Sequence, residues 1–234
     1  MTFIKKFISN LWLEAYYINE KNILRLLNGN PSAKLIDLGC DDGKLSIKFA
    51  RKINTSNIYG VDIIEESLRL AKKKKIITIK ADLNNKLPLS NNFFDIVIAN
   101  QVIEHISNLD NFISEIFRIL KKNGYAIIST ENASSWCNIF ASIMGWQIFS
   151  LTNITRKKSG LGNPIALHRN SKNTRQLTSW THKTVLNYYG LIEFLKIYDF
   201  KVNRVLTSGY FPFPGFMAKL DKIHSHFITI KISK

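Results

Sequence analysis

Short hydrophobic runs alternate along this chain with segments whose hydrophobic residues recur at helical spacing. Runs of this length bounded by turn residues are typical of buried strands, and the segments between them are typical of amphipathic helices. The predicted strands in the first half are 34–38, 57–61, 76–80, 94–99 and 125–130. The predicted helices between them follow Gly43 and cover 65–74 and 107–120. Strands that alternate with helices predict an α/β fold with a doubly wound, mostly parallel sheet.

Both ends of the chain add elements to this pattern. Residues 3–28 have helical spacing, and the Asn28-Gly29-Asn30-Pro31 sequence is a typical helix end. Phe3, Phe7 and Trp12 beside Lys5 and Lys6 would also suit an interfacial membrane helix, but we favour a helix packed over the mouth of the domain. Towards the C-terminus we predict a helix over 181–198 and strands over 200–207 and 227–232.

Polar residues mark the carboxyl ends of four successive strands. Asp37, Asp62, Asp82 and Asn100 each stand where a predicted strand ends, which is the edge where ligands bind in such sheets. The turn after the first strand contains Gly39 and Gly43, and the helix begins beyond it. This spacing is not the G-x-G-x-x-G dinucleotide pattern. A turn rich in carboxylates favours a ligand that carries positive charge.

Composition limits the function classes. A chain of 234 residues with 45% hydrophobic content is most simply one domain, and no window resembles a membrane span. Two cysteines, Cys40 and Cys137, form no disulfide framework or metal pattern, which favours reduced thiols in the cytoplasm. The net charge of +16 comes mostly from lysine, whereas base readout favours arginine. We therefore do not favour a nucleic acid partner, and a basic face would equally suit anionic lipid or a phosphorylated substrate.

Residues 34–130 resemble a class I S-adenosylmethionine-dependent methyltransferase, with the family's motifs in their usual order through Val102-Ile103-Glu104-His105. The resemblance implies a Rossmann-like seven-stranded sheet whose last strand enters antiparallel. The loops around residues 131, 163, 168 and 210 resemble those of a methyltransferase-11-like, small-molecule and glycan-type subgroup that is often associated with sugar and cell-surface glycan pathways. Asp42 departs from the family pattern, where Gly or Ser is common, but Asp tolerates such turns.

The resemblance also implies S-adenosyl-L-methionine as cofactor and a set of residues that bind it. Asp37 and the glycine turn would surround the methionine part, Asp62 would take the ribose hydroxyls, and Asn100 would lie by the methionine amino group. Asp82 would meet the adenine amino group and the backbone N–H of Leu83 the adenine ring. The full expected set is Asp37, Gly39, Cys40, Gly43, Asp62, Ile63, Asp82, Leu83 and Asn100.

The expected organisation is one methyltransferase domain over residues 1–234. An N-terminal helical segment (1–30) precedes the cofactor-binding core (34–130), and 181–234 complete the sheet. Residues 131–180 carry Trp136, Trp146, Phe149 and Trp180, and an insertion this long and aromatic is best explained as a substrate cap. The alternative for its basic, glycine-containing stretch, residues 156–173, is a disordered loop.

Among acceptors, a hydroxyl of a small molecule or of a glycan or cell-surface precursor is favoured. The chain lacks the Pro-Pro-Tyr-like run of amino-group nucleic acid methyltransferases and a cysteine placed for pyrimidine C5 chemistry. His105 is the expected general base and His168 the second candidate, against the alternative that His105 only packs or caps a helix. Glu104 and His105 alone offer too few ligands for a metal ion, so no metal is expected.

Two other functions stay open from the sequence. One is an RNA or protein methyltransferase that uses the lysine-rich face, and the other is a non-catalytic interaction protein that binds the cofactor. The expected location is cytoplasmic, with peripheral membrane contact as an option. The sequence points to no particular oligomeric state.

Overall fold

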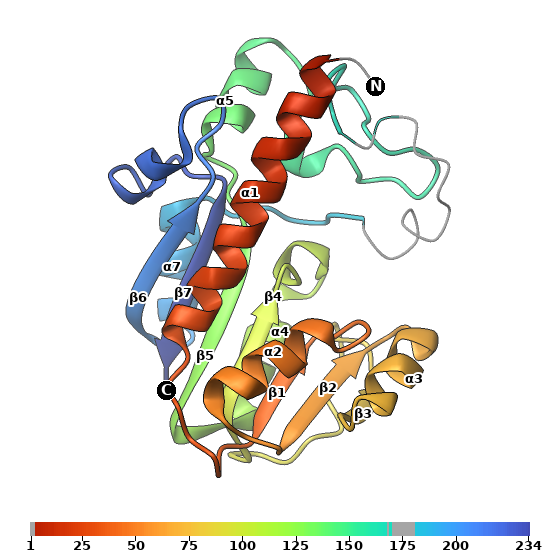
Figure 1. Ribbon diagram of the computed structural model, residues 1–234, viewed down its shortest axis with the longest axis vertical. Helices are drawn as coiled ribbons and strands as arrows, with labels where there is room; N and C mark the ends of the chain where they lie inside the picture. The colour runs from red at the N-terminus through yellow and green to blue at the C-terminus, as the bar shows by residue number, and fades with distance from the viewer. Residues whose placement is uncertain (1–2, 168, 170–180) are drawn as a thin grey trace.

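A single seven-stranded sheet forms the centre of the protein, a computed structural model of which describes residues 3–167, 169 and 181–234 (Figure 1). The strand order is β3-β2-β1-β4-β5-β7-β6. The strands are β1 (Leu35–Leu38), β2 (Ile58–Asp62), β3 (Ile77–Lys80), β4 (Phe94–Asn100), β5 (Leu120–Glu131), β6 (Lys201–Ser208) and β7 (Phe227–Ser233). The α-helices are α1 (Phe3–Leu26), α2 (Lys44–Ile53), α3 (Glu65–Lys73), α4 (Leu109–Ile119), α5 (Trp136–Ile143) and α7 (Tyr188–Ile197), and the 3₁₀ helices are η1 (Ile103–His105), η2 (Phe149–Leu151) and η3 (Gly215–Lys219).

Strand direction confirms the fold expected from the sequence. β1 to β5 pair in parallel, whereas β7 pairs antiparallel with both β5 and β6. In a doubly wound sheet of this kind the parallel strands all end at one edge, and the crevice outside that edge is the usual ligand site. The sheet therefore brings the four predicted strand-end residues to one edge.

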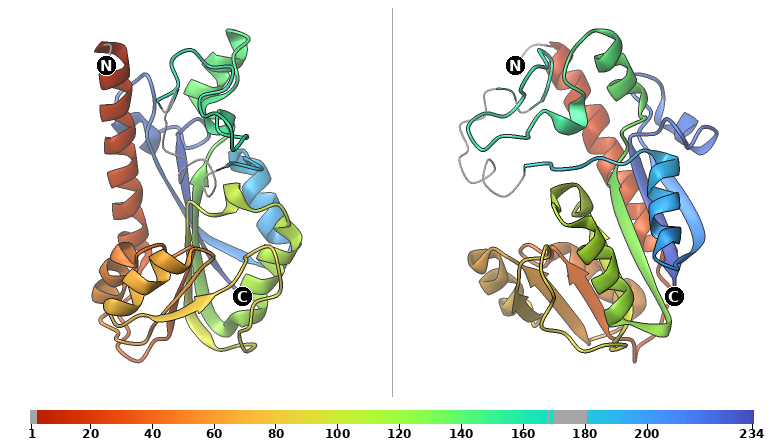
Figure 2. Two further views of the ribbon diagram at one scale, coloured as in Figure 1. Left: turned by 90° about the vertical axis from the view of Figure 1, so that its right-hand side faces the viewer. Right: turned by 180° about the vertical axis from the view of Figure 1, so that it is seen from behind.

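Helices cover both faces of the sheet, and the central strands are buried on both sides (Figure 2). Along β4, Ile96 and Ile98 enter the core that α1 and α2 share, whereas Val97 and Ala99 enter the core under α4 and α7. This alternation follows from the two-residue period of a strand, and burial on both faces explains why the strands read as continuous hydrophobic runs.

The N-terminal helix α1 lies along the face of β5, β6 and β7 (Figures 1 and 2). Its fully buried Asn19 donates from Nδ2 to Asn100 Oδ1 at 3.0 Å and accepts from the hydroxyls of Ser129 and Thr229, each at 2.7 Å. A buried amide satisfied from three strands fixes the position of the helix, because each lost partner would leave an unpaired buried group. The helix thus packs on the sheet face and contacts a predicted site residue. No helix in the described part of the chain combines the length and hydrophobicity that crossing a membrane requires.

Two predicted boundaries are wrong. The helix predicted from residue 181 begins at Tyr188, because the side chain of Asn187 caps it by accepting from the Gly190 N–H at 2.7 Å. Residues 181–187 are not helical. They pass beside η1, where the Lys183 N–H donates to the Glu104 carbonyl at 2.6 Å. β5 begins at Leu120 rather than at residue 125, because Leu120 already pairs with Phe94 before a register shift.

The described part of the 131–180 segment contains regular elements joined by buried polar contacts. It lies beyond the carboxyl ends of β4 and β5 and contains α5 and η2 (Figure 1). Buried Asn138 joins these two elements, because its Nδ2 donates to Ser150 Oγ at 2.9 Å and its Oδ1 accepts from the Ser150 N–H at 3.3 Å. Buried Asn163 donates to the Gln147 carbonyl at 3.0 Å. Trp180 lies outside the described residues.

Candidate active site

The turn between β1 and α2 adopts a backbone that only small residues accommodate. Gly39 and Gly43 both have φ of 76°, in the left-handed region. A Cβ on Gly39 would lie 2.6 Å from Val102 Cγ2, and one on Gly43 would collide with Ile76. The other left-handed residue of the turn is Asp41, with φ of 45°, rather than Asp42. Hydrogen bonds hold the turn in this shape, because the N–H groups of Gly39 and Cys40 both donate to the Val61 carbonyl.

Cys40 lies in this turn, but its side chain is buried beneath it. A Cβ on Gly60 of the neighbouring strand would lie 2.6 Å from Cys40 Sγ, so the glycine makes room for the thiol. The backbone N–H of Cys40 donates to the Val61 carbonyl at 3.0 Å. These contacts make Cys40 a packing residue of the turn.

Asp37 is a buried carboxyl group within β1. Its Oδ2 accepts from the hydroxyl of Ser46 on α2 at 2.5 Å, which ties the strand to the helix beyond the turn. Burial raises the pKa of Asp37 to about 7, with the negative charge of Asp62 adding to the rise and the Ser46 hydrogen bond opposing it. A carboxyl with this pKa is close to ionising at neutral pH, and a nearby cation would favour its charged form.

The raised pKa of Asp37 predicts how Asp37→Asn affects stability. The folded pKa of about 7 exceeds the 3.8 of an aspartate in an unfolded chain, so ionisation of the buried carboxyl costs stability as pH rises from about 4 to 7. The variant lacks this cost. Its free energy of unfolding relative to wild type should therefore be higher at pH 8 than at pH 5, by up to about 3 kcal/mol at 1.36 kcal/mol per pKa unit. Urea unfolding at both pH values measures this, and an equal difference at pH 5 and pH 8 would contradict the assignment.

Asp62 at the end of β2 holds the glycine turn in place. Its Oδ2 accepts from the Asp41 N–H at 2.9 Å and its Oδ1 from the Ile64 N–H at 2.8 Å. Asp41 in turn accepts from the Ser67 hydroxyl at 2.6 Å. Each carboxylate oxygen can accept a second hydrogen bond. Asp62 is therefore oriented by the backbone and can still accept hydrogen bonds from a ligand. The next residue, Ile63, has an exposed side chain.

Asp82 and Asn84 form a turn after β3. Asp82 Oδ1 accepts from both the backbone N–H of Asn84 at 2.9 Å and its side-chain amide at 2.8 Å. Asn84 Oδ1 accepts from the Ser107 N–H at 2.7 Å, which links this loop to the start of α4. Asp82 Oδ2 takes no part in these bonds, and the adjacent Leu83 is half-buried. The loop thus presents a fixed carboxylate at the same edge as Asp62.

Asn100 ends β4 beside the glycine turn and is held by Asn19 of α1, as described above. The following residue, Gln101, has a positive φ of 56°, and its backbone N–H donates to the Ser129 carbonyl at 2.8 Å. The chain therefore turns sharply after β4 and leads into η1. Asn19 was not anticipated from the sequence, where it is one polar residue within a helix.

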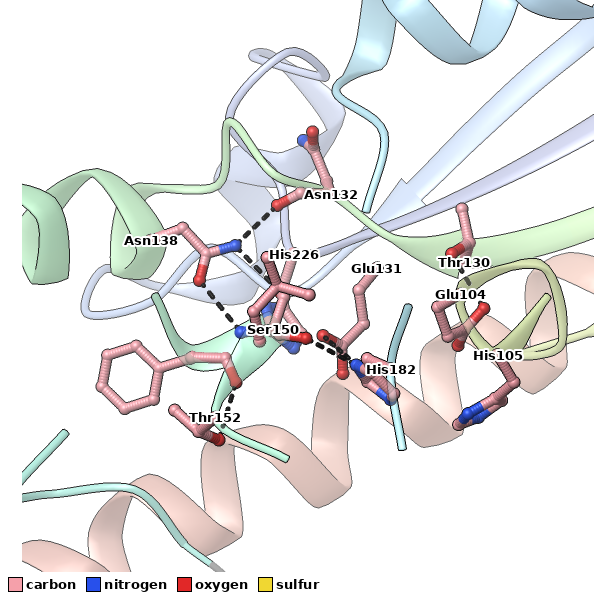
Figure 3. Close-up of polar contacts among 12 residues, drawn as sticks. Glu104, His105, Thr130, Glu131, Asn132, Asn138, Ser150, Thr152, His182 and His226 are labelled. Atoms are coloured by element: carbon pink, nitrogen blue, oxygen red, sulfur yellow. Dashed lines mark hydrogen bonds and ion pairs between the residues drawn. The ribbon is translucent and has the colours of Figure 1, made fainter. Parts of the chain in front are cut away.

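A second polar cluster lies next to this edge, between η1, the end of β5 and the 181–187 segment (Figure 3). Glu104 is buried, and its Oε2 accepts from the Thr130 hydroxyl at 3.0 Å. Burial raises the pKa of Glu104 to about 8. His105 lies 3.2 Å from the Thr181 carbonyl through Nδ1, and its ring meets that of His182 edge-on at a centroid distance of 4.8 Å. Burial, and then His182, lower the pKa of His105 to about 4, so its imidazole is neutral at pH 7.

His182 and Glu131 belong to the same cluster, although the sequence reading did not single them out. His182 Nδ1 lies 2.5 Å from the Ser150 carbonyl and 4.0 Å from Glu131 Oε2. Glu131 ends β5, so the strand-end argument that selected Asp37 and Asp62 would also have selected it. His182 had no such signal, because it falls where a helix was predicted. The second candidate base, His168, lies outside the described residues.

The strand-end residues and the neighbouring Glu104–His105 cluster are suited to different tasks, binding a charged ligand and activating a hydroxyl group. The carboxylates at the strand ends are suited to a ligand with positive charge and several hydroxyl or amino groups. The neighbouring cluster offers a neutral imidazole and a buried carboxyl, which are suited to activating a hydroxyl group. This cluster contacts the 131–167 segment, because His182 Nδ1 lies 2.5 Å from the Ser150 carbonyl.

Comparison with known proteins identifies the class. A family model described as "Methyltransferase domain" matches residues 30–183. The ubiquinone biosynthesis O-methyltransferase of Pelagibacter ubique is 31% identical over 114 residues, which are 47% of this chain and 47% of that protein. The protein of the same name from Rickettsia typhi is 26% identical over 85% of this chain and 79% of its own length. The match covers 35% of the rat enzyme of that name, so the chain spans about a third to a half of the length of the first relatives.

Solved structures show the same fold. An S-adenosylmethionine-dependent methyltransferase from Mesorhizobium loti superposes with a TM-score of 0.60 at 17% identity, covering 96% of this chain and all of that one (100%). A methyltransferase from Listeria monocytogenes superposes with a TM-score of 0.62 at 17% identity, covering 93% of this chain and 99% of that chain. The family match covers more than half of the chain. The chain therefore belongs to the class I S-adenosylmethionine-dependent methyltransferase family, whose cofactor is S-adenosyl-L-methionine.

Proposed function

We propose that this protein transfers a methyl group from S-adenosylmethionine to a hydroxyl oxygen of a small-molecule or glycan acceptor. The observation that carries the proposal is the adjacency of two groups at one sheet edge: the glycine turn with its strand-end carboxylates, and the Glu104–His105 cluster. The similarity to proteins named as O-methyltransferases, including a malonyl-[acyl-carrier protein] O-methyltransferase from Legionella pneumophila, supports an oxygen acceptor.

The strand-end residues fit the cofactor. Gly39 and Gly43 allow the left-handed backbone of the turn and its close packing on Val102 and Ile76. Asp62, oriented by two backbone N–H groups, suits the paired hydroxyls of a ribose, and Asp82 suits an exocyclic amino group. Asp37 suits the positive charge of the methionine part, because a cation would stabilise its ionised form. We assign these residues, with Leu83 and Asn100, to cofactor binding.

The acceptor would lie between the cofactor edge and the 131–180 segment, which we propose as its cap within a single domain. When bound, S-adenosylmethionine supplies the methyl group on a sulfonium. The acceptor oxygen bonds to the methyl carbon as the carbon–sulfur bond breaks, and the hydroxyl proton must leave. We assign the activation of that hydroxyl to His105, whose imidazole is neutral and carries a lone pair at pH 7.

Methyl-labelled S-adenosylmethionine tests the acceptor class. Full-length protein is incubated with fractionated cell extract, and the label is followed in small-molecule, glycan, RNA and protein fractions. Label in a small-molecule or glycan fraction, retained as a methyl ether or ester and absent with Asp62→Ala, is the expected result. Label confined to RNA or protein would overturn the proposal in favour of the basic-face alternatives. Cofactor binding with no labelled product in any fraction would favour a non-catalytic role.

A further inference from the structure

Backbone carbonyls fix the protonation of the two histidines in the cluster. His105 Nδ1 lies 3.2 Å from the Thr181 carbonyl oxygen, and His182 Nδ1 lies 2.5 Å from the Ser150 carbonyl oxygen. A carbonyl oxygen only accepts hydrogen bonds, so each Nδ1 must carry the proton. In a neutral imidazole the lone pair then lies on Nε2. Both rings therefore offer Nε2 to a third group.

The carboxylate of Glu104 lies beside these rings. Glu104, His105 and His182 each offer one ligand atom, and these three atoms lie within 4.8 Å of one another (Figure 3). Within the described residues this is the group of three whose arrangement suits a metal ion. From the sequence, only Glu104 and His105 were considered as metal ligands. His182 lies beside them because residues 181–187 pass next to η1.

We propose that Glu104, His105 and His182 bind a divalent transition-metal ion. Two imidazole nitrogens and one carboxylate oxygen are the donor set of many catalytic zinc sites, in which a fourth position stays open for water or substrate. Zinc holds such atoms at about 2.0–2.2 Å, so the three side chains would move closer together to share one ion. Imidazole ligands also favour zinc and its neighbours over magnesium or calcium.

The surroundings of the three side chains support this site independently. Histidines that bind metal usually donate their other ring N–H to a carbonyl or carboxylate, and both histidines here do so. His182 Nδ1 also faces Glu131 Oε2 at 4.0 Å. The Thr130 hydroxyl fixes Glu104 by donating to Oε2 at 3.0 Å. All three ligands are thus oriented before any ion arrives.

This inference deepens the proposed function and rests on it for the role of the ion. An ion in the cluster would bind the acceptor oxygen in its open position and lower the pKa of that hydroxyl, so that the proton passes to solvent. The lone pair of His105 then holds the ion rather than the proton. The residue assignment stands on the cluster itself and is testable without an acceptor.

Metal binding is measured on full-length protein freed of metal by a chelator. Zn²⁺ is titrated by calorimetry and Co²⁺ by visible absorption, whose bands report nitrogen and oxygen coordination. We expect wild type to bind one ion per chain. His182→Ala and Glu104→Gln should each lower the affinity for the ion by at least about a hundredfold, because mutation of residues that only hydrogen-bond to metal ligands already lowers metal affinity 10- to 100-fold. His224→Asn is the matched control, because His224 pairs with Asp221 outside the cluster and should bind like wild type.

Circular dichroism confirms that each variant is folded. Wild-type protein that binds no ion, or His182→Ala that binds as tightly as wild type, would overturn the site. Methyl transfer that persists unchanged after chelation would overturn the ion's role in the reaction while leaving the proposed function intact. Tight, His182-dependent binding in a protein that methylates no oxygen would support the site and overturn the proposed function.

Discussion

His105→Ala is expected to lower the rate of methyl transfer by about a hundredfold to ten-thousandfold, while S-adenosylmethionine binds as to wild type. Loss of a group that activates a hydroxyl typically costs this much in the chemical step. His105 lies on η1, beyond the strand end that carries Asn100, so its removal leaves the cofactor edge unchanged. Single-turnover measurements with saturating cofactor isolate this step.

The matched control for His105→Ala is again His224→Asn, which removes an imidazole that lies outside the cluster. It should keep wild-type turnover. A His105→Ala protein with wild-type single-turnover rates would show that the histidine only packs against His182 and Thr181. The same measurement on His168→Ala would then test the second candidate predicted from the sequence.

Asp62→Ala is expected to weaken S-adenosylmethionine binding by at least about a hundredfold. Two charge-assisted hydrogen bonds to the ribose would be lost, each worth about 1.5–3 kcal/mol, and 1.4 kcal/mol corresponds to a factor of ten. The change also frees the Asp41 and Ile64 N–H groups that now bind the carboxylate, which loosens the glycine turn. Calorimetric titration of the folded variant measures the loss.

Two variants sharpen the Asp62 prediction. Asp62→Asn keeps one oxygen as an acceptor and should lose less affinity than Asp62→Ala. Asp95→Asn changes an acid at the start of β4, at the opposite edge of the sheet, where its carboxylate binds the Lys34 N–H and Lys121. It should bind the cofactor like wild type. Equal affinity in wild type and Asp62→Ala would remove Asp62 from the site.

The fold was predictable because its signals are local. Continuous hydrophobic runs such as β4 alternate with amphipathic helices, and this pattern alone indicates a doubly wound sheet. The strand-end rule then placed Asp37 and Asp62 at one edge without any knowledge of their contacts. The antiparallel entry of β7 came from the family resemblance, since hydrophobic pattern carries no information on strand direction.

Contacts between distant segments were not predictable in the same way. His182 lies near Glu104 because α7 begins only at Tyr188, which leaves residues 181–187 outside the helix. Asn19 reaches Asn100 across 81 residues of sequence, and nothing in the spacing of α1 marks it as the residue that faces β4. Both cases depend on tertiary packing, which overrides the local pattern.

A crystal structure of the protein soaked with S-adenosylhomocysteine tests the central claim most directly. The account predicts density for one ligand per chain along the carboxyl ends of β1, β2 and β4, with the ribose hydroxyls on Asp62 and the adenine amino group beside Asp82. The ligand's sulfur should face the Glu104–His105 cluster. A ligand bound at the opposite edge of the sheet, or no ligand at the glycine turn of folded protein at saturating concentration, would contradict it.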